Sequence, residues 1–122
     1  MMTIYISLPI TGQEDAARRK AQGIKAALSR KGHRPVNPFD IYPGKNPTYA
    51  DYLCYDLLAL ADCDAIYLCE GWQYSRGCRI ERAFAQEFGL QLIYEDAGTC
   101  KYSSGDNGIT QSISMIDSKT DL

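Results

Sequence analysis

Two acidic residues between positions 56 and 81 could perform chemistry on a bound ligand, and small residues near one of them would leave room for it. Glu81 follows Ser75 and Gly77 on a predicted helix, and this helix comes shortly after an apolar strand of residues 65–69. Gly77 precedes Glu81 by four residues, so both lie on one side of the helix, and the glycine leaves space there. In open α/β sheets, strand carboxyl ends and helix amino ends meet where ligands bind. Glu81 could therefore point into a pocket.

The spacing by itself favours a plainer interpretation of these acids. Glu81 would then be a surface residue beside Arg79 or Arg82, because other residues of its helix have core spacing. The predicted buried stripe of that helix consists of Ile80, Phe84 and Phe88. Asp56 lies beside a leucine stripe on the preceding predicted helix, and its spacing also favours a solvated side chain over a pocket wall. Tyr5, near the middle of the first strand, could face a pocket or pack in the core with a bonded hydroxyl.

Two hydroxyl residues and an aromatic residue have more than one interpretation. Ser75 and Thr11 have the pattern of helix N-caps, and the amides that a cap satisfies can also hold an anion. Thr11 precedes Glu14 by three residues, which predicts a capping box. Trp72 lies in a predicted loop, where it could stack a planar base or cover the core.

Three arginines, Arg76, Arg79 and Arg82, fall in the first two turns of the helix that carries Glu81. The helix dipole disfavours cations at the amino end of a helix, so a bound anion or a neighbouring glutamate would offset the unfavourable charge of these arginines. Solvated arginines on an exposed face are the alternative.

The elements that must position these residues alternate along the chain. Strands are predicted at residues 3–8, 34–37, 65–69 and 90–94, and helices between them. We expect an α/β, flavodoxin-like or Rossmann-like three-layer sandwich with a four- to five-stranded, mainly parallel sheet. The first and third strands would then be neighbours, so the loops Ser7–Gly12 and Glu70–Gly77 would share one pocket. Residues 1–97 form the predicted domain, and residues 98–122 a polar extension that packs on the domain or on a neighbouring subunit.

Composition excludes several classes of function. The chain has 122 residues and a net charge of −2, so no general field attracts nucleic acid polymers or membranes. No apolar run is long enough to span a membrane, and no signal peptide is evident, so we expect a cytoplasmic protein. The five cysteines form no C-x-x-C pattern and read as buried thiols in a reducing compartment. With a single histidine, no metal site is predicted.

Several segments together resemble the DUF4406 family, within the nucleoside 2-deoxyribosyltransferase-like superfamily. The resemblance covers roughly residues 3–95. It rests on Tyr5-Ile6-Ser7-Leu8-Pro9-Ile10-Thr11-Gly12, Asn37-Pro38-Phe39-Asp40, Asp56, Cys63-Asp64-Ala65, Gly71-Trp72, Ser75-x-Gly77-Cys78-Arg79-x-Glu81 and Ala83 to Gly89.

The resemblance implies roles for specific residues. The characterised superfamily members are nucleoside deoxyribosyltransferases and 2′-deoxynucleoside 5′-monophosphate N-glycosidases. By similarity, Glu81 is the nucleophile on the anomeric carbon, Asp56 contacts the sugar and assists the leaving base, and Tyr5 holds the glutamate. Ser75 and Gly77 match the phosphate-binding loop of the monophosphate glycosidases. The remaining substrate-binding residues implied are Ser7, Pro9, Ile10, Thr11, Gly12, Trp72 and Arg79.

The first loop departs from the family pattern at two places. Ser7-Leu8-Pro9 stands where relatives usually have Ala-Gly-Pro, and a leucine there is expected to narrow the approach of a ligand. Thr11 stands where phosphate-selective relatives have an arginine, a role that Arg76 or Arg79 could take.

The leading hypothesis is an N-glycosidase or 2-deoxyribosyltransferase that acts on a nucleoside or nucleoside 5′-monophosphate. Such chemistry needs two carboxyl groups about 5 Å apart for retention and requires no cofactor. A non-catalytic nucleotide-binding module and an interaction protein with a tyrosine-rich surface are the alternatives. The superfamily further implies a homodimer or higher homo-oligomer.

Overall fold

The structure is a computed structural model that describes residues 1–95. The polar extension expected at residues 98–122 lies outside the described residues. Within the described part of the chain, no helix is both long and apolar enough to cross a membrane.

Four parallel strands form one sheet in the order β2-β1-β3-β4. The strands are β1 (Thr3–Ser7), β2 (Arg34–Val36), β3 (Ala65–Leu68) and β4 (Gln91–Tyr94). This order confirms the flavodoxin-like α/β prediction, with β1 inside the sheet and β2 at an edge. Pro35 is tolerated there because an edge strand does not need every backbone N–H group for pairing. Ser7 pairs with Leu68 where β1 and β3 end, which brings the two loops that follow to the same edge.

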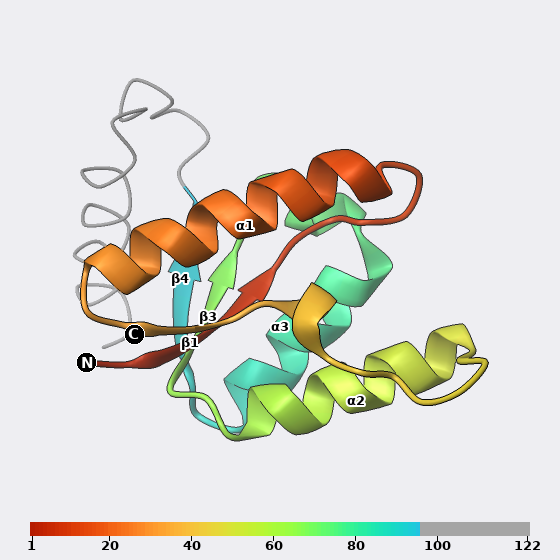
Figure 1. Ribbon diagram of the computed structural model, residues 1–122. Helices are drawn as coiled ribbons and strands as arrows, with labels where there is room; N and C mark the ends of the chain where they lie inside the picture. Colours follow the sequence, from red (N-terminus) through yellow and green to blue (C-terminus); the bar gives the residue numbers. More distant parts are fainter. Residues whose placement is uncertain (96–122) are drawn as a thin grey trace.

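Helices cover both faces of the sheet (Figure 1). The α-helices are α1 (Glu14–Arg30), α2 (Tyr49–Ala61) and α3 (Arg76–Glu87), and two short 3-10 helices are η1 (Pro38–Asp40) and η2 (Trp72–Tyr74). Helix α1 lies on one face, whereas α2 and α3 lie on the other, so the domain has the three predicted layers. Helix α2 begins with a capping box between Thr48 and Asp51, as its sequence predicts.

The predicted cap of α1 at Thr11 is wrong. The N-cap is Gln13, whose side chain makes no capping hydrogen bond. The backbone N–H of Gln13 donates to the carbonyl of Ile10 at 2.9 Å, so Thr11 and Gly12 form a turn and the helix starts later. Gly12 adopts a φ of 82°, which glycine accepts readily. Glu14 still folds back, because its carboxylate accepts from the Gly12 N–H at 3.3 Å.

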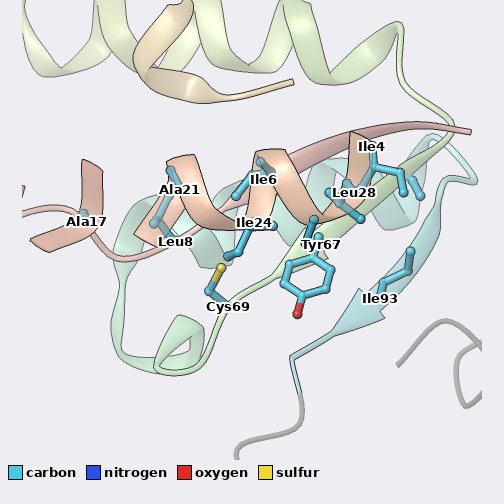
Figure 2. Packing of buried hydrophobic residues seen from close by; sticks show 12 residues of the cluster. Ile4, Ile6, Leu8, Ala17, Ala21, Ile24, Leu28, Tyr67, Cys69 and Ile93 are labelled. Atoms are coloured by element: carbon cyan, nitrogen blue, oxygen red, sulfur yellow. The ribbon is translucent and has the colours of Figure 1, made fainter. Parts of the chain in front are cut away.

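Alternation along β1 divides the core into two parts. Ile4, Ile6 and Leu8 point toward α1 and join an apolar cluster with residues of that helix (Figure 2). Tyr5 points to the opposite face, where a second cluster packs against α2 and α3. The side chain of Leu8 therefore lies on the α1 face of the sheet, away from the α3 face to which Tyr5 points.

Most of the cysteines placed by the structure are buried, as expected, with one exception. Cys63, Cys69 and Cys78 are buried, whereas Cys54 is exposed on α2. Cys54 faces outward because the inward stripe of α2 consists of other residues, including Leu60. Cys100 lies outside the described residues.

Candidate active site

Glu81 is buried between α3 and the sheet. Its side chain is 6% exposed, which overturns the surface position favoured by spacing. The buried face of α3 consists of Cys78, Glu81 and Ala85 rather than the predicted Ile80, Phe84 and Phe88. Cys78 and Ala85 are small enough for the helix to lie close to the strands, whereas Phe88 is 59% exposed and stacks on Phe84. The orientation of α3 therefore turns the carboxylate inward.

Two hydroxyl groups from β1 hold the Glu81 carboxylate. The Tyr5 hydroxyl donates to Oε2 at 2.8 Å, and the Ser7 hydroxyl donates to Oε1 at 2.8 Å. Tyr5 and Ser7 are two positions apart on one strand, so their side chains emerge on the same face of the sheet. Both oxygens of Glu81 thus have a neutral donor, and the carboxylate is fixed from both sides.

Asp56 approaches this cluster from α2. It is partly buried, and both Tyr5 and Glu81 lie within hydrogen-bonding reach of its carboxylate. Burial raises the pKa of Asp56 to about 6, although the hydrogen bonds from Tyr5 and Glu81 oppose this rise. The structure thus brings together the three predicted catalytic residues, and it places Asp56 in the wall of the cluster rather than in solvent.

The electrostatics of the cluster favour one shared proton. Burial raises the pKa of Glu81 to about 8, and the nearby charge of Asp56 raises it further, while hydrogen bonds from Ser7 and Tyr5 oppose the rise. Two carboxyl groups this close do not both ionise easily, so their titration belongs to the pair. Near neutral pH the pair therefore holds one carboxylate and one carboxylic acid.

Tyr5 remains a hydrogen-bond donor across the physiological pH range. Its side chain is fully buried. Burial, followed by the negative charges of Glu81 and Asp56, raises the pKa of the Tyr5 hydroxyl well above its ordinary value. A phenol in this setting orients a carboxylate and does not act as a base.

The start of α3 is capped by Ser75, and a residue of α2 lies against its first turn. The Ser75 hydroxyl accepts from the Cys78 N–H at 3.3 Å, so Ser75 is the predicted N-cap. A Cβ atom at Gly77 would lie 3.3 Å from the Tyr49 hydroxyl, so the glycine permits this close approach. The sequence interpretation did not single out Tyr49. It precedes Asp56 by seven residues, which is two helical turns, and that spacing could have indicated a shared face.

The loops after β1 and β3 meet, as their shared edge predicts. The backbone N–H of Cys69 donates to the Ser7 carbonyl at 2.9 Å, and a Cβ atom at Gly71 would lie 3.5 Å from Cγ of Pro9. Thr11 and Gly12 are exposed, whereas Pro9 and Ile10 are partly buried.

These loops also line an open cavity of about 450 Å³ toward the first turns of α1. Its lining residues are Leu8, Pro9, Gln13, Ala16, Ala17, Lys20, Glu70, Gly71 and Tyr74. Glu81 and Asp56 do not line this cavity, because they lie on the opposite face of the sheet. Leu8 consequently lines the cavity on the α1 side and does not stand over Glu81.

Trp72 and the three arginines have partners within the protein. The Trp72 ring packs against Tyr94 at 5.7 Å between centroids, and the Arg82 guanidinium lies 5.0 Å above Trp72. Trp72 therefore covers the second core cluster.

The other two arginines also have partners. Arg79 donates to the Gln73 carbonyl at 3.0 Å. The guanidinium of Arg76 lies 5.9 Å from the centre of the Tyr49 ring. The structure does not bring Trp72 or Arg79 to the Glu81 carboxylate.

Among residues 1–95, no group of three or more His, Cys, Asp or Glu side chains could hold a metal ion.

Comparisons with known proteins agree with this architecture. The family described as Domain of unknown function (DUF4406) matches residues 2–94. No curated protein matches the chain by sequence. Among solved structures, the fold is similar to that of the CMP N-glycosidase BcmB of Clostridium botulinum, with a TM-score of 0.55 and 16% identity. The likeness covers 75% of this chain and 69% of that protein. At this identity it establishes the fold.

Proposed function

The chain belongs to the DUF4406 family, and we propose that it cleaves the N-glycosidic bond of a nucleoside or nucleoside 5′-monophosphate with retention. The enzyme would act as an N-glycosidase or as a 2-deoxyribosyltransferase. One observation carries the proposal. A buried Glu81 accepts hydrogen bonds from Tyr5 and Ser7 and lies beside Asp56, and burial raises the pKa of both acids. The fold similarity to a CMP N-glycosidase is consistent with this assignment.

The first step needs the charge on Glu81 and the shared proton on Asp56. The pKa values of about 8 for Glu81 and about 6 for Asp56 favour the reverse distribution in the free protein, so substrate binding must move the proton from Glu81 to Asp56. The Glu81 carboxylate forms a bond to the anomeric carbon while the carbon–nitrogen bond breaks, and that electron pair moves to the base. The departing base takes its proton from Asp56, which becomes a carboxylate. Retaining enzymes of this type place their carboxyl groups about 5 Å apart. In the free protein the Asp56 and Glu81 side chains interact directly, so substrate binding would have to separate them.

The second step releases the sugar from Glu81. Water attacks the anomeric carbon and gives a proton to Asp56, while the bond to Glu81 breaks and its carboxylate is restored. If the N–H of a second base takes the place of water, the product is a new nucleoside. Tyr5 holds Glu81 in its attacking orientation in both steps.

Substrate contacts are proposed for the loops at the carboxyl edge of β1 and β3. The backbone amides near Ser75 and Gly77 start α3 and suit a 5′-phosphate or sugar oxygen. Residues Pro9 to Gly12 would form the opposite wall. Arg79, in the first turn of α3, is the candidate anion contact and would have to leave the Gln73 carbonyl to reach an anion. Trp72 is a candidate base contact only if it leaves Tyr94.

A substrate screen tests the proposed function. The protein is incubated with a panel of deoxynucleosides and their 5′-monophosphates, and free base is measured by chromatography. We expect base release that falls more than about 10⁴-fold in Glu81→Gln, because that variant lacks the nucleophile. Unchanged release in Glu81→Gln would contradict the mechanism.

A non-catalytic nucleotide-binding module is the second candidate. It is favoured by the 6% exposure of Glu81, whose oxygens are already paired in the free protein. Nucleotide binding measured by calorimetry, unchanged in Glu81→Gln and without base release, would select this candidate.

We also propose that two copies of the chain pair through α2. Tyr52, Tyr55 and Leu58 are 50%, 44% and 66% exposed on this helix. The only charged residues of α2 are Asp51, in the capping box, and Asp56, so its outer face is uncharged and can meet its own copy without repulsion. Light scattering should find a dimer that Leu58→Glu dissociates. Ala26→Glu, on the exposed face of α1, is the matched control, and a wild-type monomer would contradict this pairing.

A further inference from the structure

We propose that Ser7 is a positioning residue for Glu81, not a direct substrate contact. Its hydroxyl fixes the second oxygen of the carboxylate and so holds the nucleophile in its reactive orientation. This inference rests on the proposed function, and it reassigns a residue that the sequence interpretation placed among the substrate contacts. The geometry that carries it is the 2.8 Å hydrogen bond from Ser7 Oγ to Glu81 Oε1.

Ser7 is poorly placed to bind a ligand directly. Its side chain is 1% exposed, and its hydroxyl proton is already donated to Glu81. The residue is the last of β1, and its backbone is paired with β3 on one side. A buried hydroxyl needs a partner, and here that partner is the carboxylate. Serine at this position is therefore explained by Glu81.

Two donors achieve what one donor does not. Tyr5 alone would hold Oε2 but would leave the carboxylate free to turn about that contact. Ser7 holds Oε1 from the same strand, so the plane of the carboxylate is set by two fixed points. Because β1 lies inside the sheet, both donors stand on a rigid element, which favours precise positioning.

Ser7 also influences the ionisation of Glu81. A donor to the ionised carboxylate stabilises the charged form, so the Ser7 hydroxyl opposes the rise in the pKa of Glu81 that burial causes. The groups that face Glu81 are Tyr5 and Ser7 from β1, Asp56 from α2, and the buried thiol of Cys78 from α3. Loss of the Ser7 hydroxyl removes the donor to Oε1 and leaves the hydrogen bond from Tyr5 to Oε2.

Three variants separate positioning from simple packing. Ser7→Ala removes the donor, Ser7→Thr keeps a hydroxyl, and Ile6→Val alters the neighbouring buried residue on the opposite face of β1. We expect Ser7→Ala to lower kcat about 10-fold to 100-fold with little change in KM, because a hydrogen bond to a charged group is lost. The acid limb of its pH profile should move to higher pH. Ser7→Thr should recover both properties, and Ile6→Val should leave the pH profile unchanged.

A second measurement requires no substrate. The ¹³C chemical shift of the Glu81 side-chain carboxyl is followed by NMR as a function of pH in the same variants. The Glu81 titration should move to higher pH in Ser7→Ala and stay near the wild-type position in Ile6→Val. A titration in Ser7→Ala that matches the wild type would overturn the inference, even if the protein has no glycosidase activity. If the wild type releases no base but the Glu81 titration moves to higher pH in Ser7→Ala, the proposed function is rejected and the inference about Ser7 stands.

Discussion

The two faces of the sheet serve different purposes although they share the same strands. On the α1 face, β1 contributes Ile4, Ile6 and Leu8 to an apolar cluster (Figure 2). On the α3 face, the alternate residues Tyr5 and Ser7 bind a buried carboxylate. Burying a charge or a polar group is unfavourable unless it is paired, whereas burying apolar side chains stabilises the fold. The α1 face therefore stabilises the domain, and the α3 face carries the chemistry at some cost in stability.

The outer surfaces of the helices differ in a similar way. Glu14, Asp15 and Arg18 are among the exposed charged residues of α1, so its outer face suits water. The outer face of α2 carries exposed tyrosines and Leu58 instead. The site and the proposed pairing surface both lie on the α2/α3 side of the sheet. Changes on that side should therefore affect activity or pairing, whereas changes on the α1 side should affect stability.

After Glu81→Gln, the largest expected effect of a change on the α3 face is a loss of activity in Asp56→Asn. The variant cannot protonate the leaving base, so kcat should fall by about 10²–10⁴-fold while the fold is retained. Wild-type kcat/KM should be bell-shaped in pH, with limbs near the values of about 6 and about 8 of the acid pair. Asp56→Asn should lose the alkaline limb, because no shared acid remains to ionise.

A matched control and an activated substrate sharpen the Asp56 experiment. Asp51→Asn changes another aspartate of α2, which caps the helix, and should leave kcat unchanged. A 7-methylguanine deoxynucleoside already carries a cationic base that leaves without protonation, so Asp56→Asn should cleave it nearly as fast as the wild type. Equal losses on both substrates would show that Asp56 is not the acid.

On the α1 face, Leu28→Ala should produce the opposite pattern. Leu28 is fully buried in the apolar cluster, so its truncation should lower the free energy of unfolding by about 2–5 kcal/mol. Urea denaturation measures this loss. Below the unfolding transition kcat should match the wild type, because the α3 face is intact. A fall in kcat comparable with that of Asp56→Asn would mean that the two faces are not separable.

The smallest expected effect is a pH-dependent gain in stability in Glu81→Gln. The pKa of Glu81 is about 8 in the folded protein and about 4.3 in an unfolded chain. Between these values the folded state binds more protons, so stability falls as pH rises. The raised pKa of Asp56 acts in the same direction below about pH 6.

Glutamine cannot ionise and removes the Glu81 part of this dependence. At pH 9 the variant should be more stable than the wild type by on the order of 2 kcal/mol, with a much smaller difference at pH 4. Thermal unfolding at several pH values provides the measurement. Stability curves for the two proteins that run parallel across this range would contradict the raised pKa.

Much of the fold could be predicted from the sequence, because periodicity and caps are local signals. The four strands, the start of α2 at Thr48 and the edge position of β2 follow from such signals. The cap predicted at Thr11 is wrong, because a turn closed by the Gln13 N–H and the Ile10 carbonyl competes with the helix for the same residues.

The site was harder to predict, because burial on α3 depends on tertiary packing. Local spacing placed Glu81 outside, since Ile80, Phe84 and Phe88 form a larger apolar stripe. The sheet instead accepts the face with Cys78 and Ala85, whose small side chains allow close packing. Spacing leaves two interpretations for Glu81, Asp56 and Tyr5, and the family resemblance selects the catalytic one. The contact of Ser7 with Glu81 joins residues 74 positions apart, and no local pattern contains it.

The most direct test of the central claim is to find the sugar attached to Glu81. The protein is mixed with a deoxynucleoside 5′-monophosphate that it cleaves, quenched rapidly in acid and digested, and its peptides are analysed by mass spectrometry. We predict a 5-phospho-2-deoxyribosyl adduct on the peptide that contains Glu81, and none in Glu81→Gln. Base release accompanied by an adduct on another residue, or by a product of inverted anomeric configuration, would contradict the assignment of Glu81 as the nucleophile.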